Sequence, residues 1–269
     1  MKRRVAYGLI AALAAVLIGA GAWGAAWLAG TTDGVRWLMD AVSRHTPLTI
    51  SAREVEGRLL DRLHLVGVRL ALAPVEVEME RLDFRWTPRY LLSGRVAAQE
   101  LTLTGVQIRD NTPKGTPPDL AWPRFPGLVG FFDGRVDRLR VDGLTYRSLG
   151  GPPVSVAAIS SSVAWRSALL SLADLAVVAP AGRITGSIET VLYAPFLRFD
   201  LTVTPATPLA GMDAFSLRGR LLPGRGPEQL SGGFTAAGSS GKLKRLELAG
   251  DAGMTRKGFN LRQMRLERP

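Results

Sequence analysis

A short motif with a glycine at a fixed place recurs along the chain, and it constrains the fold more than any other feature. A charged residue is followed by Leu-x-[Leu/Val]-x-Gly-[Val/Leu] in segments 62–68, 100–106 and 138–144, with a partial copy at 245–250. The three complete copies follow one another at an interval of 38 residues. Repeats of this length build elongated proteins in which each unit packs on its neighbours. The sequence therefore predicts a repeat architecture.

The glycine of each motif marks a change in the apolar pattern. Apolar residues stand two and four positions before the glycine, and then one and three positions after it. Alternate residues of a strand point to opposite faces, so one extra residue is needed at the glycine to keep a single apolar face. A β-bulge supplies that residue, and glycine accepts the left-handed conformation. We therefore expect bulges at three positions, with a tight turn at the glycine as the alternative: Gly67, Gly105 and Gly143.

A clear period of two lies between the first two motifs. In segment 75–80 apolar residues alternate with glutamates, and in segment 81–86 they alternate with charged residues. This pattern is typical of an antiparallel sheet with one apolar face and one wetted face. Short helical turns are expected at 88–92 and 167–172. Further strands are expected at 101–103, 139–141, 183–191, 197–203, 215–221 and 243–248.

Repeated bulges bend a sheet, so these strands should not form a flat layer. The fold class we predict is mainly β. An N-terminal transmembrane helix is followed by a curved, repeat-built antiparallel β sheet that forms an elongated open trough, a β-groove.

The N-terminal segment supports the membrane part of this prediction. Val5 to Ala29 contains no charge, and it follows Lys2, Arg3 and Arg4. A helix of that length measures about 37 Å and can cross a hydrocarbon core of about 30 Å. Basic residues before the span place the N-terminus inside. A cleaved signal peptide, with its site at 20–22, is the alternative; both interpretations predict export of the chain beyond about residue 31.

Five regions follow from these patterns. The amphipathic helix among them carries Val35, Leu38, Met39 and Val42 on one side, so it either lies on the membrane surface or covers the end of the β core. The regions are 1–30, a cytoplasmic basic tip and anchor; 31–47, the juxtamembrane helix; 48–110, the first β-groove repeat; 111–127, a Pro-rich loop; and 128–269, further repeats.

Composition excludes several function classes. The chain has no cysteine and only two histidines, which excludes a disulfide scaffold and a thiol nucleophile and argues against a metal site. We expect His64 and the glutamates at 76, 78 and 80 to be solvated. The formal net charge of +11 suits nucleic acid or anionic lipid, but export makes nucleic acid an unsuitable partner. No enzyme activity, metal or cofactor is expected.

The apolar face is the candidate site. Its side chains would line a lipid trough, each buried methylene contributing about 0.8 kcal/mol, or they would form an ordinary core. The candidates are Val75, Val77, Met79, Leu82, Phe84, Trp86, Val163 and Trp165.

The order of five segments after the apolar N-terminus resembles the start of the TamB/AsmA-like family of envelope proteins. The resemblance covers residues 31–110 and becomes repeat-like afterwards. The segments are 34–38 (GVRWL), 55–60 (VEGRLL), 63–69 (LHLVGVR), 82–92 (LDFRWTPRYLL) and 101–106 (LTLTGV).

This resemblance implies a single-pass inner-membrane protein of Gram-negative-type bacteria, with a cytoplasmic N-terminus and a periplasmic β-groove. The implied role is phospholipid transport toward the outer membrane. The alternative role is a scaffold subunit of a translocation and assembly module for outer-membrane β-barrel proteins and autotransporter secretion, with a TamA-type barrel partner. Family members are usually longer, and this chain ends at Arg268-Pro269 amid strand-like sequence, so we expect it to be an N-terminal part.

Overall fold

In the residues that it describes, a computed structural model contains one α-helix and one long sheet. The described residues are 30–113, 133–191, 194–209, 212–224, 228–239, 246–255 and 258–267. The predicted membrane anchor and most of the predicted Pro-rich loop lie outside these ranges. Within the described part, no helix combines the length and the apolar character needed to cross a membrane.

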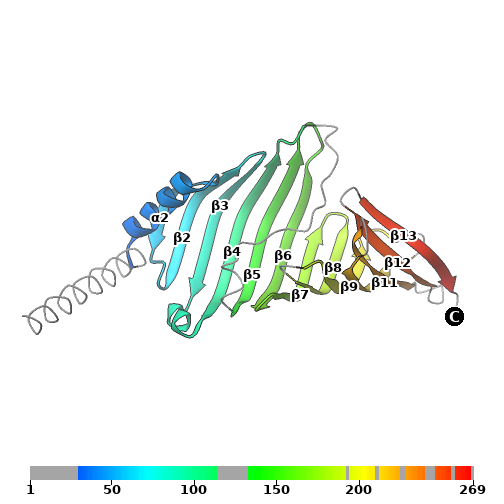
Figure 1. The fold of residues 1–269 in the computed structure, drawn as a ribbon. Coiled ribbons are helices and arrows are strands. Elements are labelled where there is room, and N and C mark those ends of the chain that lie inside the picture. The colour runs from blue at the N-terminus through cyan, green and yellow to red at the C-terminus, as the bar shows by residue number, and fades with distance from the viewer. Residues whose placement is uncertain are drawn as a thin grey trace, which may run out of the picture.

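Thirteen strands lie side by side in the order of the sequence and form a single twisted, open sheet (Figure 1). A mainly β fold built on an open sheet was predicted and is confirmed. The elements are α2 (Thr32–His45), β1 (Thr49–Gly57), β2 (Arg62–Leu72), β3 (Val75–Trp86), the 3-10 helix η1 (Pro88–Ser93), β4 (Arg95–Asp110), β5 (Asp133–Ser148), β6 (Val154–Arg166), β7 (Leu169–Ala179), β8 (Gly182–Val191), β9 (Leu197–Pro205), β10 (Ala214–Pro223), β11 (Glu228–Ser239), β12 (Leu246–Thr255) and β13 (Gly258–Glu267).

One pairing corrects the prediction of a purely antiparallel sheet. β4 and β5 pair in parallel, with Leu101 opposite Leu139 and Leu103 opposite Val141. β4 ends at Asp110 and β5 begins only at Asp133, so the intervening chain is long enough for the return crossing that a parallel pair requires. The alternating pattern of a strand is the same in both senses of pairing, which is why it did not reveal this one.

The two expected helical turns differ in outcome. The segment at 88–92 lies within η1, as predicted. The turn expected at 167–172 is wrong, because β7 already begins at Leu169 and only residues 167 and 168 turn the chain there, Ser167 with φ of 54°. The short apolar run at this place fits a helix and a strand equally well by its period alone.

The motif glycines form part of one row that crosses six strands. Gly67, Gly105 and Gly143 have φ of 63°, 65° and 71°, which is the left-handed region. The pairs on either side of each glycine keep one register, so no strand gains a residue relative to its neighbour at this place. The change of phase is therefore shared by all six strands and differs from a β-bulge, in which two residues of one strand oppose one of its partner. We call this the glycine row; it consists of Arg53, Gly67, Glu80, Gly105, Gly143 and Ala157.

Several buried side chains of the sheet flank the glycine row on the apolar face. Leu65, Val68, Met79, Val106 and Val141 are 3–8% exposed and belong to one core cluster. Among the described elements, α2 is the only one that packs on this cluster from outside the sheet. The side chains of this cluster therefore cover one another.

α2 covers the β1 end of the apolar face. Its N-terminus is capped by Thr31, whose side chain accepts a hydrogen bond of 3.0 Å from the backbone N–H of Gly34. Val35 is buried in the core cluster, and Met39 packs against it. The Ser43 hydroxyl accepts a hydrogen bond of 2.8 Å from the backbone N–H of Ile50 in β1. The helix is thus fixed to the first strand along its length.

A small polar network joins the ends of the parallel strands. Asp110 accepts hydrogen bonds from the backbone N–H and hydroxyl of Thr112 and from the Tyr146 hydroxyl, 2.9 Å away. The Thr112 bonds, and then the Tyr146 bond, lower the pKa of Asp110 from 3.8, while the Asp110 bond raises the pKa of Tyr146 above 10.0.

We predict that Thr112→Val raises the pKa of Asp110 more than Tyr146→Phe does, as measured by NMR of the carboxyl carbon. Because folding lowers the pKa of Asp110, its hydrogen bonds stabilise the folded protein above pH 3.8. This stabilisation is lost as the pH falls through the pKa that Asp110 has in the folded protein. If the pKa of Asp110 rises more in Tyr146→Phe than in Thr112→Val, the Tyr146 bond and not the Thr112 bonds would be the main cause of the lowered pKa.

Candidate functional site

The eight candidate side chains occupy two strands. Six lie on β3 and two on β6. On β3 the glycine row separates Val75, Val77 and Met79 from the three that follow it. Because the phase changes at Glu80, both sets can face the same side of the sheet. Four of the six belong to the core cluster or pack against it: Val77, Met79, Leu82 and Phe84.

Apolar residues on neighbouring strands extend this surface in both directions. Val77 lies opposite Leu70 of β2 and Ile108 of β4. Four residues beyond the row, Phe84 likewise lies opposite two apolar residues, Leu63 and Leu101. On β6, Val163 lies opposite Val136 and Leu172. The candidates therefore belong to one apolar face that runs from β1 through β7.

The C-terminal strands continue the apolar face, which the sequence patterns did not indicate. Their cross-strand partners form an unbroken line from β7 to β12 in which aromatic rings and glycines alternate. The ring of Phe199 occupies the place where a Cβ at residue 219 would lie. The line consists of Leu172, Ile188, Phe199, Gly219, Phe234 and Gly250.

Most of the candidate side chains are only half-buried. Met79 is 6% exposed, whereas the other seven fall in the intermediate class. In β13, Leu261 and Met264 are 58% and 57% exposed. A closed core would bury such residues almost completely, and contiguous exposed apolar surface usually marks a binding site. The face is therefore accessible to an apolar ligand within the described part of the chain.

Two tryptophans shape the end of the face near η1. Trp86 stacks on Phe84 with ring centroids 5.9 Å apart, and its indole N–H donates to the backbone oxygen of Leu59. Trp165 lies over Gly134 of β5, in the space that a side chain at residue 134 would fill. Both rings thus lie in fixed positions near the sheet surface.

The opposite face of the sheet is charged. Glu78 binds Arg69 at 2.7 Å and Arg109 at 3.3 Å, which joins β2, β3 and β4. Arg218 and Asp200 form a similar pair at 3.1 Å between β10 and β9. Exposed pairs of this kind contribute roughly 0–1 kcal/mol each. They identify this face as the one in contact with water.

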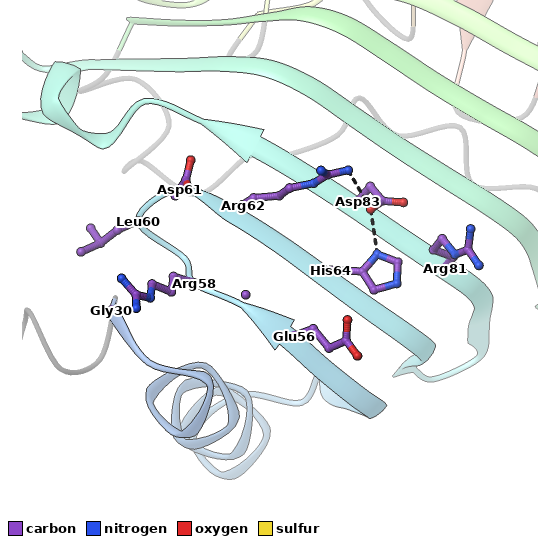
Figure 2. Close-up of a pocket in the computed structure, with 10 residues that line it drawn as sticks. Gly30, Glu56, Arg58, Leu60, Asp61, Arg62, His64, Arg81 and Asp83 are labelled. Carbon is purple, nitrogen blue, oxygen red and sulfur yellow. Dashed lines mark hydrogen bonds and ion pairs between the residues drawn. The ribbon is translucent and has the colours of Figure 1, made fainter.

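A pocket of about 780 Å³ opens on the charged face near the β1–β2 hairpin (Figure 2). Here the His64 Nδ1 lies 2.7 Å from the Asp83 Oδ1, and Arg62 lies 3.9 Å from the same oxygen. His64 is therefore bonded to a carboxylate, where the sequence analysis expected a solvated side chain. Three arginines are matched by three carboxylates, so the pocket offers no net charge to an ionic ligand. Its charged residues are Glu56, Arg58, Asp61, Arg62, Arg81 and Asp83.

This charged pocket lacks the features of a reaction centre. Hydrolysis needs a nucleophile within reach of a base, and no serine, threonine or cysteine lines the pocket. Nowhere in the described ranges do three or more histidine, aspartate or glutamate side chains gather as metal ligands. We therefore treat the pocket as an ion-pair network and the apolar face as the candidate functional site.

Comparison with known proteins bears on the same region. A family model described as the N-terminal domain of TamB matches residues 22–177. Neither a curated protein nor a solved structure matches the chain. The matched range contains α2, the glycine row and all eight candidate residues.

Proposed function

The chain belongs to the TamB family, and from this premise we propose that its apolar face carries phospholipid acyl chains from the inner membrane toward the outer membrane. The protein would act in biogenesis of the cell envelope, anchored in the inner membrane by one N-terminal helix. The observation that carries the proposal is the continuous, half-buried apolar face of the open sheet.

The dimensions of the sheet suit this role. Thirteen strands at about 4.8 Å spacing extend over about 60 Å, so a ligand that contacts a few neighbouring strands occupies only part of the sheet. Each methylene placed on the face contributes about 0.8 kcal/mol, so an acyl chain of moderate length is held without any specific polar contact. A surface without strong specific sites lets a lipid move along it.

Headgroups would remain at the ends of the strands, where the face meets water. At the η1 end a pocket of about 620 Å³ is lined by Trp165 together with Arg95, Arg135 and Arg166. Asp133 is the one acid that lines this pocket, and it accepts a hydrogen bond of 2.8 Å from the backbone N–H of Ser167. The excess of arginine favours a phosphate beside the apolar face.

We propose no catalytic activity for the apolar face, because the eight candidate side chains that line it are hydrocarbon, thioether or indole groups. No bound cofactor or metal is part of the proposed function. The partners are phospholipid, the inner membrane and, by family, a TamA-type outer-membrane barrel protein.

A second candidate function rests on the sheet edges. β1 and β13 each pair with one strand only among the described elements. An open edge offers unpaired N–H and C=O groups, to which a client strand can add. This favours a scaffold that helps outer-membrane β-barrel proteins or autotransporters to assemble.

Photocrosslinking in cells tests these two functions. We expect probes at Val77, Phe84 and Val163 to form phospholipid adducts detected by mass spectrometry, because these residues lie on the apolar face. A probe at Glu78, which binds two arginines on the charged face, should form none. Adducts to barrel proteins without lipid would support the scaffold instead. Absence of any adduct at the three apolar positions would show that they form a closed core, and the lipid function would fail.

A further inference from the structure

The pocket at the η1 end of the strands joins the two faces of the sheet. Gly134 and Trp165 are paired residues of β5 and β6 on the apolar face. The next pair along the same strands, Arg135 and Ala164, lies on the charged face, because successive residues of a strand point to opposite sides. All four residues line one pocket of about 620 Å³. The pocket therefore offers an apolar wall and a charged wall at the place where the acyl chain and the headgroup of a lipid would separate.

This pocket has more arginine than acid. Arg95, Arg135 and Arg166 line it, and Asp133 is the one acid among the described residues that does so. Arg135 also forms an ion pair of 3.2 Å with Asp137, which lies just outside the pocket. When both carboxylates are counted against the three arginines, one positive charge remains, so the pocket favours an anion.

Two of the three arginines have no carboxylate partner among the described residues. Asp133 lies opposite Arg95 in the parallel ladder, but no ion pair within the described ranges joins it to Arg95 or Arg166. Its Oδ1 instead accepts a hydrogen bond of 2.8 Å from the backbone N–H of Ser167. Both arginines are exposed, and a guanidinium group presents a planar pair of donors that matches two phosphate oxygens. Arg95 and Arg166 are therefore available to an anionic ligand.

The aromatic groups of the pocket suit the boundary between a headgroup and an acyl chain. The Trp165 ring fills the space over Gly134, and its indole N–H is buried without an acceptor among the described residues. Tyr90 also lines the pocket, and the guanidinium of Arg89 lies 5.3 Å from the centre of the Tyr90 ring. Tryptophan and tyrosine are the residues that lie where the apolar and polar parts of a lipid meet. A phosphate in the pocket would thus have an apolar surface beside it for the rest of the lipid.

We propose that this pocket binds a phosphate group of net negative charge, held by Arg95 and Arg166. The source of the phosphate rests on the proposed function: it is the headgroup of an anionic phospholipid whose acyl chain lies along Trp165 and Val163. Because both arginines are exposed, salt screens the contact and keeps it weak. The pocket therefore favours anionic over zwitterionic lipid without holding either lipid in place.

Native mass spectrometry of the purified full chain, offered phosphatidylglycerol and phosphatidylcholine with identical acyl chains, tests this selection. We expect the parent chain to retain phosphatidylglycerol about fivefold more than phosphatidylcholine, a preference of the size that two exposed ion pairs provide. Arg95→Gln with Arg166→Gln should lower this preference by about threefold or more, whereas retention of phosphatidylcholine should stay within about twofold because the acyl contacts are unchanged. An unchanged preference in this double variant would overturn the assignment to the pocket.

Arg147→Gln with Arg183→Gln is the matched control. It removes the same charge from two exposed arginines at the opposite ends of the strands, one at the end of β5 and one at the start of β8. A site in the pocket predicts that this control keeps the preference of the parent chain. Equal losses in the two double variants would show that the preference comes from the overall charge of +11 and would overturn the site. Thermal unfolding midpoints close to that of the parent chain check that both variants are folded.

Calorimetric titration with inorganic phosphate distinguishes the source of the phosphate and separates the site from lipid carriage. Phosphate binding that is lost in Arg95→Gln with Arg166→Gln, together with equal retention of the two lipids, would support the site and make its ligand a soluble phosphate. Such binding without phospholipid adducts at Phe84 would leave the site standing and refute lipid carriage. Adducts at Phe84, with equal retention of the two lipids and no binding of phosphate, would leave carriage standing and overturn the site.

Discussion

Gly105→Val should lower the free energy of opening of strands β3–β5 by about 3 kcal/mol. Gly105 has φ of 65°, a conformation that costs about 1–2 kcal/mol for a residue with a Cβ and more for a β-branched one. The new side chain would also meet the carboxylate end of Glu80, which covers Gly105 from the neighbouring strand. Backbone strain and the displaced Glu80 act together at one position of the glycine row.

Gly143 supplies the matched control. Its φ of 71° is nearly the same, but the nearest atom to an added Cβ is the backbone nitrogen of Gly105, 4.0 Å away. Gly143→Ala should therefore cost only the backbone contribution of about 1 kcal/mol, and Gly143→Asn less, since asparagine tolerates this conformation. Hydrogen–deuterium exchange of the β3–β5 amides measures the loss of opening free energy in each variant. Equal losses in Gly105→Val and Gly143→Ala would mean that Glu80 has no part in the effect.

The alternation of apolar and charged residues is enough to predict individual strands. Val75 to Trp86 alternates on either side of the phase change at Glu80, and the structure contains a strand with the same bounds. The motif also identified the positions at which the phase changes. It did not reveal that Glu80 and Ala157, which belong to no motif, lie in the same row, because a strand's own pattern carries no information about its neighbours.

Pairing and exposure depend on contacts that no single segment encodes. The parallel pairing of β4 and β5 shows only in the register of the two strands, Leu101 opposite Leu139, and not in the alternating pattern of either strand. The bond between His64 and Asp83 requires β2 and β3 to be adjacent. Both became visible only once the order of strands was known.

The candidate site was predicted best where its side chains are large. The β3 residues stand out because valine, leucine and aromatic residues alternate with charges. In β11, Phe234 and Ala236 share the apolar face with Gly232, and glycine and alanine give a weak alternating signal. The sequence analysis therefore found the beginning of the apolar face and missed its continuation.

Val163→Glu should weaken the retention of phospholipid by about 100-fold, whereas Ser160→Glu should change it less than threefold. Both substitutions add one negative charge to β6, on residues that face opposite sides of the sheet. Val163 lies on the apolar face between Val136 and Leu172, so a carboxylate there would disrupt the contacts of three to four methylenes, or about 3 kcal/mol. Ser160 is exposed opposite Arg140, which can accommodate the new charge.

Native mass spectrometry of the purified full chain measures the lipid that each variant retains. Because Val163 is only half-buried, its replacement should cost roughly 1 kcal/mol of stability, and a thermal unfolding midpoint close to that of the parent chain would exclude misfolding as the cause. Loss of lipid in Val163→Glu together with retention in Ser160→Glu would identify the apolar face as the lipid path. Equal retention in both variants would leave that face as a structural surface and favour assembly of client strands at the open edges.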